Sequence, residues 1–120
     1  MVVTTRDRLL HIKTAINDVH DAVCGLTMDV VEESRVPRLA FERAIEIISE
    51  ASKSIPDDLK KAYGQDIPWH DIASIGNLLR HAYHRTSLKA LWAIYTNDLD
   101  PLEAAIDAMM AAIPPSHPTT

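Results

Sequence analysis

Apolar side chains recur at helical spacing along most of the chain. In the first segment they follow one another at alternating steps of three and four residues, as Leu9, Ile12, Ile16, Val19 and Val23. This spacing puts them on one face of a helix, and Gly25 is a typical residue for its end. The next stripe predicts a second helix over residues 34–55, with Pro37 in its first turn and a buried face of Phe41, Ile45, Ile48 and Ile55.

The second half of the chain continues the same pattern. We expect a short helical turn around residues 59–63 and a third helix from residue 68 or 69 to about residue 85. Thr86 or Ser87 can cap a fourth helix that runs through residue 95. The last helix, which ends near residue 113, is expected to open with a capping box and an early proline, formed by Asp100, Pro101 and Glu103.

These segments together predict an all-α protein. The chain lacks the sustained apolar–polar alternation of strands, and Val30 and Val31 fall in an acidic segment that we expect to be a connection. Four main helices with an additional short helix favour an antiparallel four-helix bundle. The 120 residues are expected to form one domain over residues 1–113 and a tail over 114–120. Because so small a bundle has little core, a dimer is favoured.

Composition removes several classes of function. With a single cysteine, Cys24, the chain can form neither an internal disulfide framework nor a Cys-based zinc finger. Its three glycines cannot build a phosphate-binding loop. No apolar run approaches the roughly 20 residues of a membrane helix, and the N-terminus lacks the features of a secretory signal, so we expect a cytoplasmic protein. The net charge of −5 argues against nucleic-acid binding by the whole surface.

The predicted third helix nevertheless carries a localised basic surface. No acidic residue occurs between Asp71 and Asp98, a stretch that contains Arg80, Arg85 and Lys89. At 100° per residue, the arc opposite the apolar face holds Asn77, Arg80, His81 and His84, with Tyr83 at its border. Imidazole transfers protons near neutral pH and guanidinium stabilises phosphate charge, so this face suits phosphate chemistry. Asn77 and His81 are also spaced for a hydrogen bond, but inert histidines on a solvated face would give the same pattern.

The same segment resembles a known family. Trp69 leads to Gly76 and Asn77, followed by three residues and then by His81 and Tyr83. This order resembles the signature region of the HepT-like proteins of the HEPN superfamily, in which a tryptophan precedes Arg-Asn, three residues and His-x-Tyr. Residues 43–53 and 91–99 are similar to other segments of that family. The resemblance therefore covers about residues 9–110.

The resemblance implies a HEPN-like homodimer that acts as a metal-independent, cofactor-free endoribonuclease toxin. In that scheme His81 moves a proton to or from the RNA 2′-hydroxyl or the leaving oxygen, and Asn77 orients groups in a cleft between two subunits. The implied partner is a minimal nucleotidyltransferase antitoxin that attaches AMP to Tyr83. Such an anionic adduct would repel an RNA phosphate.

One position departs from the family pattern, because Gly76 stands where the family has arginine. Three interpretations stay open. Arg80, one helical turn later, supplies the guanidinium; Arg85 supplies it from the other subunit; or the chain is a non-catalytic nucleotide- or RNA-binding dimer. A dimeric scaffold without a ligand is a further alternative.

Two carboxylates of the second helix are candidates for a supporting role. Glu46 and Glu50 are four residues apart and can orient Arg80 or His81 across a cleft, although a solvated face is the commoner role of such a pair. His81 and His84 are three residues apart, but their helix face offers no carboxylate to complete a metal site. We therefore expect no metal there.

Overall fold

The structure of the protein is a computed structural model that describes residues 3–81 and 84–114. Within these ranges every regular element is a helix. In chain order the helices are α1 (Thr5–Val23), α2 (Met28–Glu33), α3 (Arg35–Ser52), α4 (Asp57–Tyr63), α5 (Trp69–His81), α6 (His84–Asn97) and α7 (Leu99–Ala112). The prediction of an all-α helical bundle is therefore confirmed.

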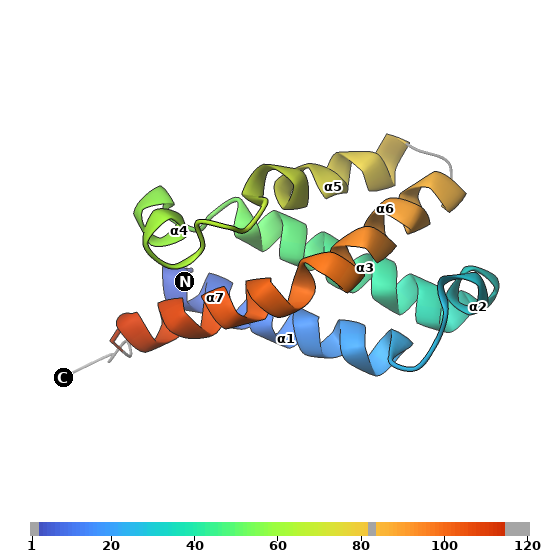
Figure 1. Ribbon diagram of the computed structural model, residues 1–120, viewed down its shortest axis with the longest axis horizontal. Coiled ribbons are helices and arrows are strands. Elements are labelled where there is room, and N and C mark those ends of the chain that lie inside the picture. Colours follow the sequence, from blue (N-terminus) through green and yellow to red (C-terminus); the bar gives the residue numbers. More distant parts are fainter. Residues whose placement is uncertain (1–2, 82–83, 115–120) are drawn as a thin grey trace.

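Three long helices and one bent pair form the body of the molecule (Figure 1). α1 and α5 both pack on α3, which makes α3 the central helix. α6 and α7 follow one another almost without interruption, so that α6 lies beside α5 and α7 lies beside α1. The short helices close the two ends: α2 contacts α3 and α6, and α4 contacts α7. The result is an elongated body of 50 × 26 × 26 Å.

The apolar stripes predicted from the sequence meet between these helices. All five predicted positions of α1 are buried, and so is the α3 stripe. The side chains that α6 and α7 bury against them include Leu88, Leu91, Leu102, Ile106 and Met109. Phe41 of α3 packs edge-on against Trp92 and Tyr95 of α6, with ring centroids 5.6 and 5.9 Å away. Burial of these stripes is what holds α3 between its neighbours.

Two segments in the first half differ from expectation. The acidic segment around Val31 is not a simple connection, since it forms α2. Thr27 caps that helix by accepting a hydrogen bond from the Val30 N–H at 3.3 Å, and Val31 is buried. A cap and one buried side chain thus outweigh the acidic composition. α3 ends at Ser52, and Ile55 reaches the core from the following turn, where its N–H donates to the Ser52 carbonyl.

Two boundaries in the second half also differ. α6 begins at His84, so His84 and Arg85 do not end the third helix. The predicted capping box at Asp100 is wrong, because α7 begins at Leu99 and Asp98 caps it without a side-chain hydrogen bond. The Asp98 N–H donates to the Ile94 carbonyl at 2.8 Å, and the Asp98 carbonyl accepts from the Leu102 N–H at 2.9 Å. Because backbone bonding continues through Asp98, no new side-chain cap is needed.

The described part of the chain ends shortly after α7. α7 ends at Ala112, and residues 115–120, expected to form a tail, lie outside the described residues. In the described part of the chain, no helix is both long and apolar enough to cross a membrane.

Candidate functional site

α5 turns one face to the core and the other to solvent. Ile72 and Ile75 are buried, whereas Asn77, Arg80 and His81 are exposed. Three of the predicted site residues therefore share one accessible surface, which we call the α5 polar face. His81 in particular does not enter the hydrophobic interior, so its imidazole is available to a ligand.

The side chain of Arg80 folds back along α5. Its Nη2 donates a hydrogen bond to Asn77 Oδ1 at 2.8 Å. A Cβ atom at Gly76 would lie 3.9 Å from both Nη atoms of Arg80, so the guanidinium sits beside the glycine. Side chains of helices normally lean toward the N-terminus, which explains this direction. The Asn77 carbonyl oxygen is used by Arg80, and no Asn77–His81 hydrogen bond is formed in the described structure.

Gly76 lies where α5 packs closely on α3. The glycine is buried, and a Cβ atom there would lie 3.7 Å from Ser49 Oγ. Ser49 is 1% exposed, and its hydroxyl donates to the Ala73 carbonyl at 3.1 Å, which ties the two helices together. Because glycine has no side chain, the space beside position 76 is left to the guanidinium of Arg80.

Arg80 also lines a groove of about 450 Å³, which we call the polar groove. Its walls come from α1, α3 and α5, and its lining residues are Arg8, His11, Arg43, Glu46, Ile47, Glu50, Ala51 and Arg80. The predicted supporting residues Glu46 and Glu50 thus share a groove with Arg80. Asn77 and His81 do not line it, although they occupy the same end of α5.

Two lining residues were missed by sequence reasoning. Arg8 and His11 of α1 lie three residues apart, a spacing that places them on one helix face. They are far from Arg80 in the sequence and belong to no motif. Periodicity assigns both to the solvent side of α1, but only the packing of α1 on α3 brings them to the groove.

The carboxylates of the groove are paired along α3 itself. Arg43 Nη1 lies 3.0 Å from Glu46 Oε1, and Lys53 Nζ lies 3.3 Å from Glu50 Oε2. Exposed pairs of this kind add little stability, but they offset the negative charge of the groove. The polar groove therefore has a local charge balance that differs from that of the acidic chain as a whole.

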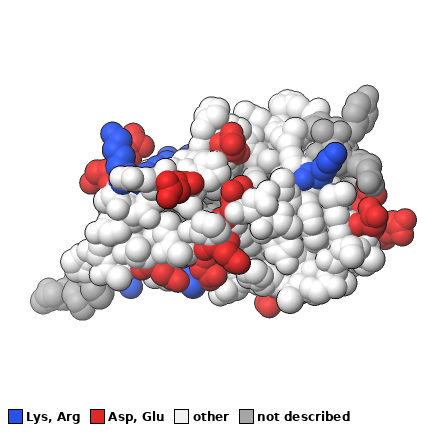
Figure 2. All heavy atoms as spheres, viewed as in Figure 1, with Lys and Arg blue, Asp and Glu red and all other residues white. Residues whose placement is uncertain are grey.

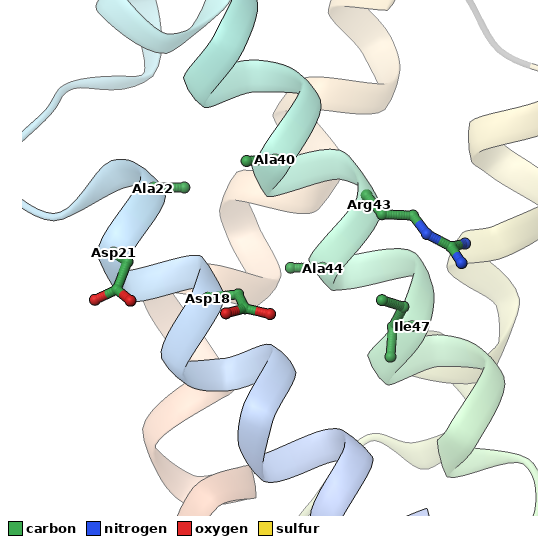
Figure 3. Close-up of a pocket in the computed structure, with 7 residues that line it drawn as sticks. All are labelled: Asp18, Asp21, Ala22, Ala40, Arg43, Ala44 and Ile47. Carbon is green, nitrogen blue, oxygen red and sulfur yellow. The ribbon is translucent and has the colours of Figure 1, made fainter.

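Toward the far end of α1 and α3 small apolar side chains line the surface, beside the carboxylates of Asp18 and Asp21 on α1 (Figure 3). A second groove of about 420 Å³ lies between the two helices, with Ala22, Ala40 and Ala44 directed into it. Arg43 instead points away from α1, toward α5. Arg43 and Ile47 line both grooves, so the two grooves form one continuous surface.

The face of the molecule seen in Figure 2 is a different one, on which α6 and α7 lie toward the viewer. Acidic side chains gather there over the region where the two helices meet. α7 and its cap supply acidic residues at positions 98, 100, 103 and 107, whereas the stretch from 72 to 97 has none. Residues 72–97, which form most of α5 and α6, thus contribute no negative charge of their own.

One group of metal-ligating side chains occurs among the described residues, and it lies on α1 and α7. The ligand atoms of His20, Asp100 and Glu103 are within 4.8 Å of one another. Lys13 Nζ already lies 2.9 Å from both Glu103 and Asp107. Its hydrogen bonds to Asp107 and Glu103 raise the pKa of Lys13, so a cation of the protein itself occupies this acidic surface. We assign no metal to the group.

Three predicted residues are not placed by the structure. Tyr83 lies outside the described residues, as do the side chains of His84 and Arg85. The expectations for the modified tyrosine and for an arginine from the other subunit stay predictions.

Comparison with known families gives a match over most of the chain. The model of the family described as ribonuclease HepT-like matches residues 12–109. The chain belongs to this family. The match confirms the resemblance seen at residues 69–83, and it includes all of α5 and the α3 wall of the polar groove. Arg8 and His11 precede the matched range.

Individual relatives agree with this assignment to the HepT-like family. The chain is 30% identical to a probable ribonuclease HepT of Thermococcus cleftensis, over 87% of this chain and 94% of the relative. It is 26% identical to a protein of Caldanaerobacter subterraneus that is provisionally named an RNase, over 89% of this chain and 95% of the relative. A protein of Methanocaldococcus jannaschii with a similar provisional name is 27% identical, over 82% of this chain and 90% of the relative. No solved structure matches significantly.

Proposed function

We propose that this HepT-like protein is an endoribonuclease that cleaves RNA without a metal ion and acts as a homodimeric toxin. The observation that carries the proposal is the α5 polar face, where Asn77, Arg80 and His81 are exposed beside a groove. Family membership over residues 12–109 supports RNA as the substrate.

The groups on this face suit a cleavage in which the ribose 2′-hydroxyl is the nucleophile. A base removes the proton of the 2′-hydroxyl, the O2′–P bond forms, and the P–O5′ bond breaks as an acid protonates the leaving O5′. The product ends are a 2′,3′-cyclic phosphate and a 5′-hydroxyl. His81 performs one of these proton transfers, and the Arg80 guanidinium stabilises the charge that develops on the phosphoryl oxygens. Asn77 holds that guanidinium through its 2.8 Å hydrogen bond.

Two proton transfers explain why a dimer suits the reaction. One imidazole that acts as the base cannot at the same moment protonate the leaving oxygen. If two subunits bring their α5 polar faces into one cleft, the partner's His81 serves as the second group. This dimer is part of the proposal, and its support is the family resemblance together with the exposure of His81.

Gly76 favours a second candidate function, a dimer that binds RNA or nucleotides without cleavage. The family's arginine is missing at this position, and with it a source of positive charge. The guanidinium of Arg80 lies beside Gly76, however, in the space that a side chain there would enter. This placement supports Arg80 as the replacement and makes catalysis the better-supported function.

His81→Ala will lower the rate of RNA cleavage in EDTA by about 10²–10⁴-fold, the usual contribution of general acid–base catalysis. Because His81 is exposed, the free energy of unfolding should change by less than about 0.5 kcal/mol. A labelled RNA and urea denaturation measure the two quantities. His70→Ala is the matched control, since His70 is an exposed histidine at the other end of α5. Unchanged cleavage by His81→Ala, or an equal loss with His70→Ala, would contradict the assignment.

Arg80→Gln will lower cleavage by about 10²–10³-fold, as expected for a group that stabilises transition-state charge. Gly76→Arg will leave the cleavage rate within about threefold of the wild-type rate, because the guanidinium of Arg80 already lies beside position 76. Gly76→Ala controls for the backbone, since its Cβ makes only ordinary contacts of 3.7 and 3.9 Å. The non-catalytic candidate predicts the reverse: wild-type protein that binds RNA without cleavage, and activity created by Gly76→Arg.

We further propose a minimal nucleotidyltransferase as the antitoxin, with Tyr83 as the residue that receives AMP. The adduct adds negative charge two residues from His81, so it should block the approach of an RNA phosphate. Co-expression with the transferase should add the mass of one AMP group and abolish cleavage, and Tyr83→Phe should prevent both effects. Tyr63→Phe is the control, because Tyr63 on α4 is 42% exposed and is expected to stay unmodified. Modification of the Tyr83→Phe protein would refute this assignment.

A further inference from the structure

The polar groove continues the α5 polar face across the surface of the protein. Arg80 belongs to both, because it follows Asn77 and precedes His81 on α5 and also lines the groove. The opposite wall is formed by Arg8 and His11 of α1, with α3 between the two walls. At about 450 Å³ the polar groove is within the size range of ligand sites.

The charges of the groove favour an anion. Glu46 and Glu50, its two carboxylates, are each paired with a cation three residues away on α3. The Arg8 side chain has no hydrogen bond and no salt bridge within the described part of the chain, although the Asp7 carboxylate interacts with it electrostatically. Among the described residues, the Arg80 guanidinium bonds only to the neutral amide of Asn77. Two guanidinium groups of the groove are therefore without a salt bridge among the described residues. This excess positive charge stands out in a chain whose net charge is −5.

The chemistry of these groups suits a phosphate, which is the anion that the proposed RNA substrate supplies. Guanidinium is planar and donates several hydrogen bonds in a fork that fits two oxygens of a phosphate. Arg8 is half-buried, so part of its freedom is already lost before a ligand binds. His11, three residues later on the same side of α1, adds a ring N–H donor next to it.

We propose that the polar groove binds the RNA phosphodiester next to the scissile one, and that Arg8 supplies its main contact, assisted by His11. The strand then runs from His81 over Arg80 toward α1. This inference rests on the proposed function, since it takes RNA as the ligand. It adds a substrate-binding residue that lies outside α5 and ahead of the family match, which begins at residue 12.

The test is direct binding of an RNA that cannot be cleaved. Fluorescence anisotropy with a labelled 2′-O-methyl oligonucleotide, measured over a series of salt concentrations, gives the affinity and its salt slope. Arg8→Gln should weaken binding about tenfold, the scale of a hydrogen bond to a charged group, and should reduce the slope by about 0.7, the value for one contact to a single strand. Arg8→Lys should bind with intermediate affinity, because it keeps the charge but loses the fork.

Arg35→Gln is the matched control, because Arg35 is an exposed arginine at the opposite end of α3, outside the polar groove. This substitution removes the same charge, and the RNA affinity of the variant should stay within about twofold of that of the wild type. Circular dichroism checks whether Arg8→Gln is folded. If that variant is unfolded, the RNA affinities of Arg8→Lys and His11→Gln are compared with that of the wild type instead. Wild-type affinity in both variants would overturn the inference.

The outcomes separate this inference from the proposed function. Equal losses for Arg8→Gln and Arg35→Gln would overturn it, because the effect would then be one of total charge. If Arg8→Gln binds RNA as the wild type does and Arg80→Gln binds more weakly, only the proposed role of the polar groove is overturned. The proposed RNA site on α5 then stays intact. Wild-type protein that fails to bind the oligonucleotide at any salt concentration would overturn the proposed function as well.

Discussion

The close packing of α5 on α3 is the constraint on which the rest of the site depends. Ile72 and Ile75 must be buried, and the Ser49 hydroxyl fixes the contact through the Ala73 carbonyl at 3.1 Å. A helix held on one side by these contacts has no freedom in what it exposes on the other. Asn77, Arg80 and His81 face solvent for that reason. The same contact buries Gly76 and leaves room for a guanidinium from the next turn.

The second constraint is electrostatic. The chain is acidic overall, but α7 and its cap hold a large share of the acidic residues of the second half, and residues 72–97 hold none. In the polar groove the carboxylates of α3 are matched by neighbouring cations, which leaves the charges of Arg8 and Arg80 available. A long polyanion such as RNA is thereby favoured at one surface only. This separation reconciles a net charge of −5 with a nucleic-acid ligand.

Much of the fold could be predicted from the sequence because strong apolar periodicity survives in tertiary structure. Every residue of the two predicted stripes is buried, although Ile55 follows the end of α3, and the polar face of α5 followed from helical geometry. α2 was missed because its signal is one Thr27 cap and one buried valine in an acidic stretch. The start of α7 was misplaced because backbone hydrogen bonds through Asp98 replace a side-chain cap, which composition does not reveal.

The site was predictable mainly where it lies on one helix, and beyond that helix only Glu46 and Glu50 of α3 were named in advance. Asn77, Arg80 and His81 share a helix face, so their proximity follows from spacing. Arg8 and His11 come to Arg80 through the packing of α1 and α5 on α3, and no local pattern encodes that contact. Nor does spacing show that Arg80 bends back over Gly76, since that depends on the empty volume beside a glycine.

The chemistry of the RNA ends produced by the wild-type protein in EDTA tests the central claim most directly. Mass spectrometry of the fragments identifies those ends without any substitution in the protein. We expect 2′,3′-cyclic phosphate and 5′-hydroxyl ends, because the imidazole and guanidinium groups of α5 activate the ribose hydroxyl as the nucleophile. Fragments with 3′-hydroxyl and 5′-phosphate ends, or cleavage that appears only when magnesium is added, would contradict the proposed mechanism.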